Sequence, residues 1–320
     1  MKPLKAELLI VFVTVCWGAS YLFMKMGLDS LGEFNLIALR FGIAFLLAAA
    51  IFGRRLLKVN MHTVGYAMLL GFLLFLVFTP IMFGLHTTTT SNAGFLVSLT
   101  VVFVPLISTL VFRKKIELSL ILSVVVAITG IALLTVQPPF AMTAGDLLCM
   151  AAAFMYAIHI MVVSIAAQKV DTLNLGILQL GFAGLYGLIF SLLFETPSLP
   201  GSPGGWAAIL MLSVVCSALG YILQTVAQKY ISPTRTGLLF ALEPVFAAAI
   251  GYWFAGEQLS TKGYIGAALV LLSIVLSTVK KQPERPIAAK RTRRMRGAAR
   301  TEPARVTAHD ADCRPDGMPG

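Results

Sequence analysis

The chain has 320 residues, of which 58% are hydrophobic and only 12% are charged. Soluble domains carry about 25% charged residues, so this composition excludes an ordinary soluble fold and indicates an all-α polytopic membrane protein. The formal net charge is +11, and much of it lies in residues 280–320. The remainder lies mainly in short loops, which is typical of topology signals and not of a nucleic-acid-binding protein.

Apolar segments predict ten transmembrane helices, because about 20 apolar residues cross a bilayer as an α-helix. In chain order the predicted spans are 7–27, 34–52, 64–85, 91–112, 118–136, 146–166, 174–194, 206–228, 235–254 and 261–279. The first segment is longer than the core of a signal peptide and lacks a clear cleavage site, so we interpret it as the first span. Most connections are short, which predicts that neighbouring spans are antiparallel.

Charged residues in the loops predict the orientation of the chain. If the spans alternate, loops on one side carry the basic residues Lys2, Lys5, Arg54, Arg55, Lys58, Arg113, Lys114, Lys115, Lys169, Lys229 and Arg235. Loops on the other side carry the acidic residues Asp29, Glu33, Glu195 and Glu257, with Lys262 as the main exception. The positive-inside rule then places both termini in the cytoplasm.

The sequence contains an internal repeat. Residues 92–103 resemble residues 235–246 at a constant offset of 143, so that Gly94 matches Gly237. The ungapped register extends into the following span, which favours a true repeat over chance similarity between apolar segments.

The first two spans align with the sixth and seventh at an offset of 139, which pairs Trp17 with Tyr156 and Arg40 with Gln179. The repeat unit is therefore five spans. An odd number of spans inverts the second copy relative to the first, and inverted repeats are an architecture of transporters. Their substrate site lies near the midplane of the membrane, between the two repeats.

The repeat divides the chain into three parts. These are a first five-helix repeat at 1–136, a second at 146–279 and a C-terminal tail at 280–320. The tail is rich in Lys and Arg and poor in large apolar residues, which predicts a disordered cytoplasmic segment. Its basic cluster either lies near anionic lipid headgroups or is a solvated tail without a specific role.

A carboxylate and a proline, Glu243 and Pro244, stand side by side in the long apolar run 239–257. A charge that faces lipid costs about 2.5–3.5 kcal/mol on insertion scales, so we expect Glu243 to face protein or water. It either lines a central cavity and binds a cationic group or a proton, or it packs between helices and bonds a neighbour.

Two more ionisable residues lie inside predicted spans. Arg40 is six residues inside the span 34–52, about 9 Å deep at 1.5 Å per residue. It either snorkels to the interface, anchors a substrate carboxylate or pairs with Glu243. His159 lies mid-span, one turn from Tyr156, and either bonds a helix neighbour or takes part in proton coupling or substrate contact.

Polar and aromatic residues cluster on two other spans. Tyr221, Gln224, Thr225 and Gln228 share one helical face, because the last three follow Tyr221 by three, four and seven residues. Such a stripe faces protein or water rather than lipid, so it either lines a cavity or forms interhelical hydrogen bonds. Trp17 and Tyr21 share a face of the first span and either pack in the core or wall a substrate site.

Motifs for catalysis or cofactor binding do not occur in the sequence. It contains no P-loop, HExxH or GxSxG motif and no His/Cys cluster with metal-ligand spacing. Its four cysteines lack CxxC spacing and are interpreted as small packing residues. We therefore expect no cofactor, no metal and no enzymatic activity.

Several short motifs resemble the EamA-type transporters of the drug/metabolite transporter superfamily. They are Trp17-Gly18-Ala19-Ser20, Leu39-Arg40-Phe41, Leu242-Glu243-Pro244-Val245 and Gly256-Glu257-Gln258-Leu259. In the first half Thr100-Val101 stands where the second half has Glu243-Pro244, so a functional carboxylate would belong to the second half only. The resemblance implies a secondary carrier that exports amino acids, other metabolites or drugs across the bacterial cytoplasmic membrane.

The sequence as a whole predicts ten transmembrane helices in two inverted five-helix repeats. The predicted function is transport of a small molecule by alternating access, and protons are a candidate coupling ion. The predicted substrate-binding residues are Trp17, Tyr21, Arg40, Tyr156, His159, Tyr221, Gln224, Gln228 and Glu243. One alternative is an integral membrane enzyme acting on lipid-linked substrates, but such enzymes need clustered polar motifs in loops longer than these. A second alternative is a nonenzymatic membrane adaptor whose tail recruits partners.

Overall fold

The computed structural model describes residues 1–112, 118–135, 142–255 and 261–278. All of these residues belong to one compact unit, Met1–Gln282. Within the described ranges the regular elements are helices, without any strand. The basic tail predicted at 280–320 lies outside the described residues.

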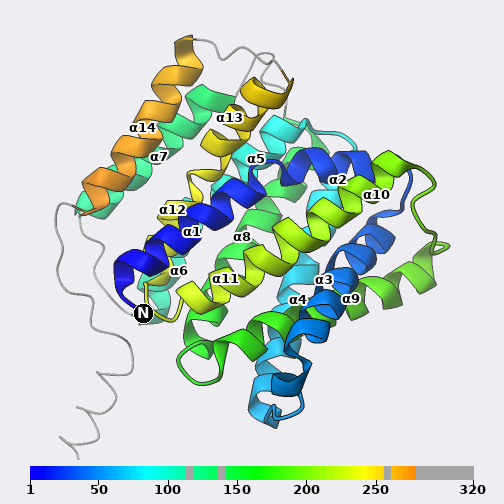
Figure 1. Ribbon diagram of the computed structural model, residues 1–320. Helices are drawn as coiled ribbons and strands as arrows, with labels where there is room; N and C mark the ends of the chain where they lie inside the picture. Colours follow the sequence, from blue (N-terminus) through cyan, green and yellow to red (C-terminus); the bar gives the residue numbers. More distant parts are fainter. Residues whose placement is uncertain (113–117, 136–141, 256–260, 279–320) are drawn as a thin grey trace, which may run out of the picture. The chain divides into compact units, whose positions relative to one another are not determined.

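The N-terminal part of the chain forms the first group of helices (Figure 1). They are α1 (Pro3–Trp17), α2 (Ser20–Leu28), α3 (Glu33–Leu56), α4 (Met61–Gly84), α5 (Thr90–Ser98), α6 (Thr100–Phe112) and α7 (Leu118–Thr135). Side-chain oxygens cap two of the starts: Asn60 accepts a hydrogen bond at the start of α4, and Thr89 does so at the start of α5. Such caps satisfy backbone N–H groups that have no partner inside the helix.

The C-terminal part forms the second group. Its elements are α8 (Ala144–Ala166), α9 (Thr172–Phe194), α10 (Pro203–Leu210), a π-helical segment (Met211–Leu219), α11 (Gly220–Ala227), α12 (Pro233–Phe240), α13 (Glu243–Ala255) and α14 (Thr261–Thr278). Thr143 and Asp146 form a reciprocal capping box at the start of α8. Ser232 caps α12, and Pro233 occupies the first turn of this helix. Proline is favoured at that position, because its missing N–H group would have no partner there.

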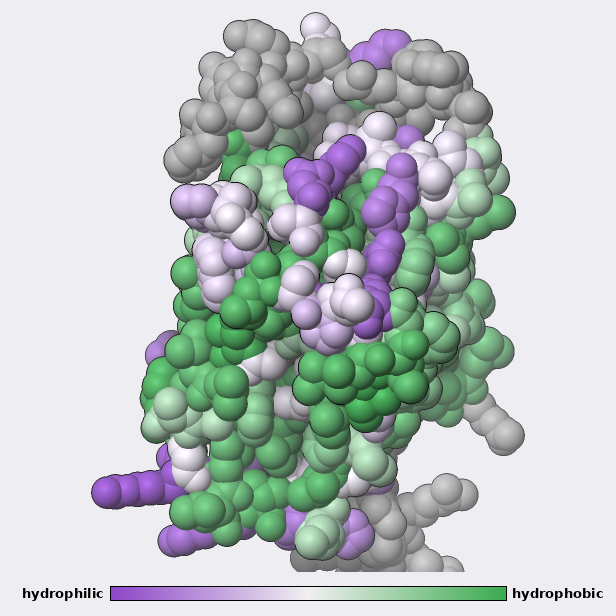
Figure 2. Space-filling model, turned by 90° about the vertical axis from the view of Figure 1, so that its right-hand side faces the viewer, coloured by the Kyte–Doolittle hydropathy of each residue, from purple (hydrophilic) through white to green (hydrophobic). Residues whose placement is uncertain are grey.

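Several of these helices are long and apolar enough to cross a membrane. Within the described residues there are seven such segments, Pro3–Leu28, Glu33–Leu56, Met61–Gly84, Thr90–Val111, Ala144–Ala166, Thr172–Phe194 and Pro203–Ala227. The shorter helices Leu118–Leu133 and Thr261–Leu276 are also apolar. Figure 2 shows a largely hydrophobic surface, with hydrophilic residues at both ends and in a strip that runs from the upper end toward the middle of this face. The predicted all-α polytopic membrane protein is confirmed, while the number of ten crossings and their inverted arrangement remain predictions.

Four of the predicted spans are not continuous α-helices. The span 7–27 is interrupted at Gly18 and Ala19, and the span 206–228 contains the π-helical segment. The spans 91–112 and 235–254 are each divided into two helices. The first interruption lies where α13 approaches closely: a Cβ atom on Gly18 would lie only 2.9 Å from the backbone nitrogen of Ala247.

The breaks in the fourth and ninth predicted spans lie at equivalent positions of the sequence repeat. Leu99 separates α5 from α6, and Leu242 lies directly before α13; the two residues obey the same offset of 143. Pro244 therefore occupies the first turn of α13, where a helix needs no donor from its backbone nitrogen. The proline starts a helix here and does not kink one.

Close glycine crossings join the helices of the two predicted halves. A Cβ atom on Gly184 of α9 would lie 2.7 Å from the nitrogen of Gly42 on α3. One on Gly130 of α7 would lie 2.7 Å from the carbonyl oxygen of Gly266 on α14, and Figure 1 shows these two helices side by side. Small residues let membrane helices approach closely, so these crossings fix the contact between the halves.

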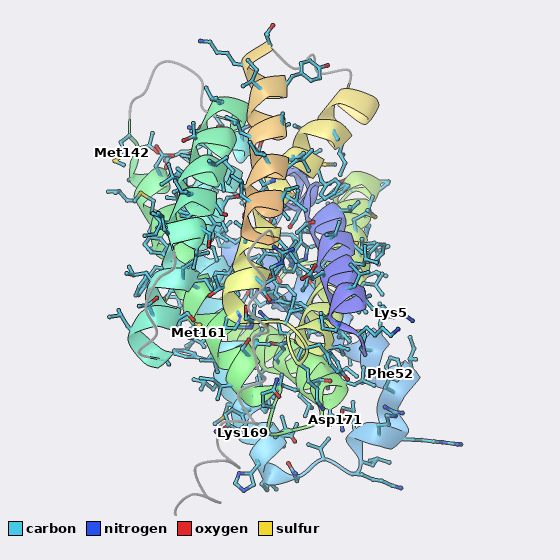
Figure 3. The ribbon with its side chains drawn as sticks, turned by 90° about the vertical axis from the view of Figure 1, so that its left-hand side faces the viewer. Lys5, Phe52, Met142, Met161, Lys169 and Asp171 are labelled. Atoms are coloured by element: carbon cyan, nitrogen blue, oxygen red, sulfur yellow. The ribbon has the colours of Figure 1, made fainter. Side chains whose placement is uncertain are left out.

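Labelled residues identify the two ends of the helical bundle. Lys5, Phe52, Lys169 and Asp171 lie toward one end, which we call the Lys5 end, and Met142 lies toward the opposite end, the Met142 end (Figure 3). Segments far apart in the sequence thus bring basic residues to the Lys5 end.

Candidate functional site

A small cavity of about 30 Å³ lies inside the bundle. Its lining combines residues of both predicted halves: Trp17, Ser20, Tyr21, Met24, Arg40, Val77, Phe78, Ile81, Val97, Tyr156, Tyr221 and Glu243. Six of the nine predicted site residues are among them, and His159, Gln224 and Gln228 are not. A volume of this size holds about two water molecules, whereas sites for small-molecule ligands occupy about 300–1,000 Å³.

Trp17 is the centre of an aromatic cluster that walls the cavity. Its ring centroid lies 5.1 Å from Tyr221, 5.1 Å from Phe240 and 6.1 Å from Tyr156. Tyr156 also stacks on Phe240 at 5.8 Å. These rings come from α1, α8, α11 and α12, so the aromatic cluster joins helices of both predicted halves. Phe240 was not predicted, because nothing distinguishes it from other apolar residues in its span.

Two local features hold the Trp17 ring in place. Its Nε1–H donates a hydrogen bond of 2.7 Å to the carbonyl oxygen of Cys216, which lies in the π-helical segment. Such segments leave carbonyl groups available that an α-helix would use internally, and they occur often at functional sites. Gly220 follows the segment, and a Cβ atom there would collide with Trp17 Nε1.

Arg40 is fully buried and does not reach the interface as a snorkelling side chain would. Its Nε donates to Ser217 Oγ at 2.7 Å, and one terminal nitrogen lies 3.3 Å from the sulfur of Met24. The guanidinium carbon lies 4.3 Å from the ring centroid of Phe78, an arrangement that stabilises a cation. Met24, Phe78 and Ser217 were not predicted, because their role depends on helices distant in sequence.

Glu243 lies in the first turn of α13, directly after the break at Leu242. The N-terminus of a helix favours negative charge, because its first N–H groups lack partners inside the helix. The repeat-equivalent residue is Thr100, whose hydroxyl donates to the carbonyl of Val97 at 2.6 Å. In the first half, the Thr100 hydroxyl group at the equivalent position thus has a hydrogen-bond acceptor. In the second half, Glu243 lines the cavity.

Arg40 and Glu243 share the cavity without bonding each other directly. Neither of the two ion pairs found among the described residues joins them. Of the alternatives for Arg40, direct pairing with Glu243 is thus not observed. The cavity contains one cationic and one acidic side chain that interact electrostatically, and a side-chain hydrogen bond joins Glu243 to Tyr21.

His159 belongs to a separate polar network. Its Nε2 lies 3.1 Å from Gln179 Oε1, and Gln179 Nε2 donates to Thr225 Oγ1 at 2.8 Å. Because the Gln179 amide nitrogen already donates to Thr225, its oxygen accepts from His159, which assigns the proton to Nε2. His159, Gln179 and Thr225 are completely buried, so the structure shows the hydrogen bond of His159 to a neighbouring helix, while its role in proton coupling or substrate contact stays a prediction.

Gln224 and Gln228 continue the polar stripe of α11 beyond Tyr221. Both side chains are buried, and neither amide has a hydrogen-bond partner among the described residues. The helical spacing correctly predicted that they avoid lipid, but the structure separates them from the cavity lining.

The described residues contain no group of three or more His, Cys, Asp or Glu side chains that could hold a metal ion. The side chains of the cavity suit an organic molecule with charged ends and an apolar body, because guanidinium and carboxylate groups bind ions of opposite charge and aromatic rings bind apolar surface.

Comparisons with known proteins agree with this architecture. The family model described as "EamA-like transporter family" matches residues 4–136 and 143–279. An "Uncharacterized transporter" of Archaeoglobus fulgidus is 27% identical over 280 residues, which are 88% of each chain. The "Uncharacterized transporter YyaM" of Bacillus subtilis is 23% identical over 291 residues, covering 87% of this chain and 95% of the relative.

A solved crystal structure of a protein also has a similar fold. It aligns with a TM-score of 0.71 and 18% identity, over 86% of this chain and 98% of the other. The chain is therefore a multi-pass membrane protein that belongs to the EamA-like transporter family.

Proposed function

We propose that the chain is a secondary transporter that exports a small metabolite across the cytoplasmic membrane of a bacterium by alternating access. The observation that carries this proposal is that Arg40, which is buried, and Glu243, which is partly exposed, line one cavity without an ion pair between them. A buried charge costs several kcal/mol unless it is paired. A substrate that carries both a negative and a positive group would pair with both residues.

Arg40 and Glu243 have complementary roles in this proposal. A guanidinium binds a carboxylate through two parallel hydrogen bonds, so Arg40 anchors the anionic group of the substrate. Glu243 binds the cationic group, or a proton when the substrate is absent. Trp17, Tyr156 and Tyr221 enclose the apolar body of the substrate. An amino acid is the simplest molecule with these three features.

Substrate binding requires the helices around the cavity to move apart. The cavity of about 30 Å³ is smaller than even a small amino acid requires. The walls come from α1 to α5 in one half and from α8, α11 and α13 in the other, so rocking of the halves would enlarge it. This is the movement that alternating access uses in transporters built from repeats.

The proposal includes the finer architecture that the sequence predicts. The chain would cross the membrane ten times as two inverted five-helix repeats, with both termini in the cytoplasm at the Lys5 end. The equivalent breaks at Leu99 and Leu242 support this arrangement, since broken helices form the central sites of many transporters. The basic residues of 280–320 would lie near anionic headgroups.

Transport into proteoliposomes tests the function directly. The purified full chain is reconstituted and loaded with L-alanine, L-phenylalanine, L-glutamine, putrescine or adenine, and uptake of the same labelled compound is measured with and without a pH gradient. We expect exchange of at least one zwitterion and loss of exchange in Arg40→Met. Exchange of putrescine or adenine alone would contradict the zwitterion site. No exchange of any compound of the panel would contradict the proposed function.

A further inference from the structure

A second cluster of polar side chains lies directly beside the cavity. His159 stacks against Tyr156 with 5.8 Å between ring centroids and meets the edge of Tyr221 at 6.2 Å. Both tyrosines line the cavity, so they form a wall between the cavity and the network of His159, Gln179 and Thr225. On α11 the cluster continues through Gln224 and Gln228. We call these five residues, His159, Gln179, Gln224, Thr225 and Gln228, the amide cluster.

The amide cluster contains hydrogen-bonding atoms that have no partner. Both polar atoms of Gln224, both of Gln228 and Nδ1 of His159 are buried and unbonded among the described residues. Native proteins pair about 90% or more of their buried polar groups, because an unpaired buried group destabilises the fold. Five such atoms, one on His159 and four on two glutamines that are one helical turn apart, therefore point to a partner from outside the chain.

We infer that the amide cluster is a second binding site, which takes an uncharged hydrogen-bonding group of the transported molecule. Its open atoms are two carboxamide groups, which donate and accept, and an imidazole nitrogen that accepts while Nε2 carries the proton. None of these groups carries a formal charge. The site thus suits a carboxamide or a hydroxyl group and disfavours an ion, which would remain unpaired in a buried setting.

The two sites occupy related places in the sequence repeat. The offset of 139 pairs Arg40, which faces the cavity, with Gln179 of the amide cluster. Both residues are buried. Arg40 bonds the hydroxyl group of Ser217 in the π-helical segment, and Gln179 bonds the hydroxyl group of Thr225 on α11, which follows that segment. The repeat thus supplies a charged site and an uncharged counterpart. This inference rests on the proposed function, because it assigns the bound group to the transported molecule.

Binding of acetamide, a neutral carboxamide, tests the second site without any transport assay. Saturation-transfer NMR is recorded on the purified full chain in detergent, with acetamide as the probe. We expect transfer to acetamide in the wild-type protein and in Arg40→Met, because Arg40 contacts no residue of the amide cluster among the contacts described. In Gln224→Leu and Gln228→Leu we expect binding to weaken about tenfold, because each replacement removes hydrogen bonds worth about 1.4 kcal/mol.

Thermal unfolding of the same variants separates binding from folding. Leucine removes an unbonded amide, so the unfolding midpoint of Gln224→Leu and Gln228→Leu should stay equal or rise. The matched control is Gln179→Leu, which removes an amide bonded to His159 and Thr225 and should lower the midpoint. A similar fall in all three variants would show that Gln224 and Gln228 serve the fold and would overturn the inference.

The outcomes distinguish the second site from the proposed function. Absence of acetamide binding to the wild-type protein would overturn the second site, and ordered water would then be the partner of the amides. Acetamide binding by a protein that exchanges no compound of the panel would support the second site as a binding site but contradict transport. If exchange occurs, Gln224→Leu should reduce exchange of L-glutamine more than exchange of L-alanine; an equal effect on both would count against the second site.

Discussion

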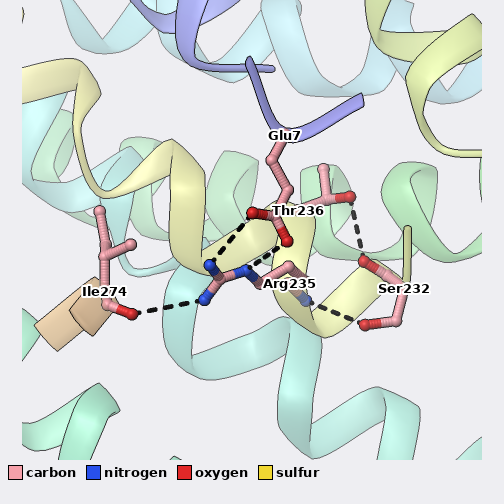
Figure 4. Close-up of polar contacts among 5 residues, drawn as sticks. All are labelled: Glu7, Ser232, Arg235, Thr236 and Ile274. Carbon is pink, nitrogen blue, oxygen red and sulfur yellow. Dashed lines mark hydrogen bonds and ion pairs between the residues drawn. The ribbon is translucent and has the colours of Figure 1, made fainter. Parts of the chain in front are cut away.

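Glu7 on α1 forms an ion pair with Arg235 in the first turn of α12, with 3.2 Å between Oε1 and Nε (Figure 4). A second contact of 3.4 Å joins the other carboxylate oxygen to a terminal guanidinium nitrogen, and Arg235 also donates to the carbonyl oxygen of Ile274 on α14. The pair joins the two predicted halves near the Lys5 end. In the sequence Arg235 counted only as a basic loop residue.

A related contact lies near the Met142 end. Asp146 in the first turn of α8 accepts a hydrogen bond from Thr88, which precedes α5. The offset of 139 pairs Glu7 with Asp146, and the offset of 143 pairs the caps Ser232 and Thr89. Each end of the bundle thus has an acidic residue of one predicted half that bonds the start of a broken span of the other half. Alternating access would require these two contacts to open in turn.

The Glu7–Arg235 pair gives the first prediction. Glu7→Arg places two cations together, and we expect the exchange rate to fall about tenfold or more, because a charged hydrogen bond worth about 1.5–3 kcal/mol is lost. Exchange in proteoliposomes is the measurement. The double variant Glu7→Arg with Arg235→Glu should recover part of the rate, and exposed Lys5→Gln on the same helix should behave as wild type. A double variant no better than Glu7→Arg would rule out the pair as the cause.

The Met142 end gives the second prediction. Thr88→Val removes the hydrogen bond to Asp146, while the capping box with Thr143 still holds the carboxylate. We expect spin labels placed across this end to move apart on average, as measured by pulsed EPR, because the state open at this end becomes more populated. Thr129→Val is the control, since its hydroxyl bonds only the carbonyl of Val125 within its own helix among the described contacts. Unchanged distances would show that the contact does not hold this end closed.

Glu243 gives the third prediction. Glu243→Gln keeps the size of the side chain but can neither carry a charge nor bind a proton, so we expect exchange to be lost while folded protein is retained. Exchange and the unfolding midpoint are both measured. Glu195→Gln is the contrasting variant: its oxygens accept from the backbone nitrogens of Phe34 and Asn35 at 2.9 and 2.8 Å, so it should lower the midpoint by weakening the start of α3. Full exchange by Glu243→Gln would contradict a role of Glu243 in binding the substrate or a proton.

Gly220 gives the fourth prediction. Alanine at an exposed helical position is about 1 kcal/mol better than glycine, but a Cβ atom on Gly220 would collide with Trp17 Nε1. Gly220→Ala should therefore displace the indole, break its bond to Cys216 and lower both the unfolding midpoint and exchange. Gly53→Ala on α3 is the matched control, because nothing lies within 4 Å of its Cβ position, and its midpoint should stay equal or rise. Equal midpoints in the two variants would show that the Trp17 position is not constrained by Gly220.

The local sequence determined the membrane class, the approximate helical segments and the family. Those properties depend on short-range patterns: apolar runs as long as a bilayer is thick, charges confined to loops, and motifs such as Trp17-Gly18-Ala19-Ser20 and Leu242-Glu243-Pro244-Val245. The same patterns correctly indicated that Arg40, Glu243 and the stripe of α11 avoid lipid, because the cost of burying charge in hydrocarbon does not depend on the fold.

Only the tertiary structure decided which of these residues meet. Tyr221, Gln224 and Gln228 share one face of a helix by spacing alone, yet Tyr221 lines the cavity and the two amides lie beyond it. The breaks at Gly18 and Leu242, the π-helical segment and the glycine crossings set the rotation and depth of each helix. These features arise from contacts between helices more than a hundred residues apart, such as Gly18 with Ala247, and no local pattern encodes the geometry of such a contact.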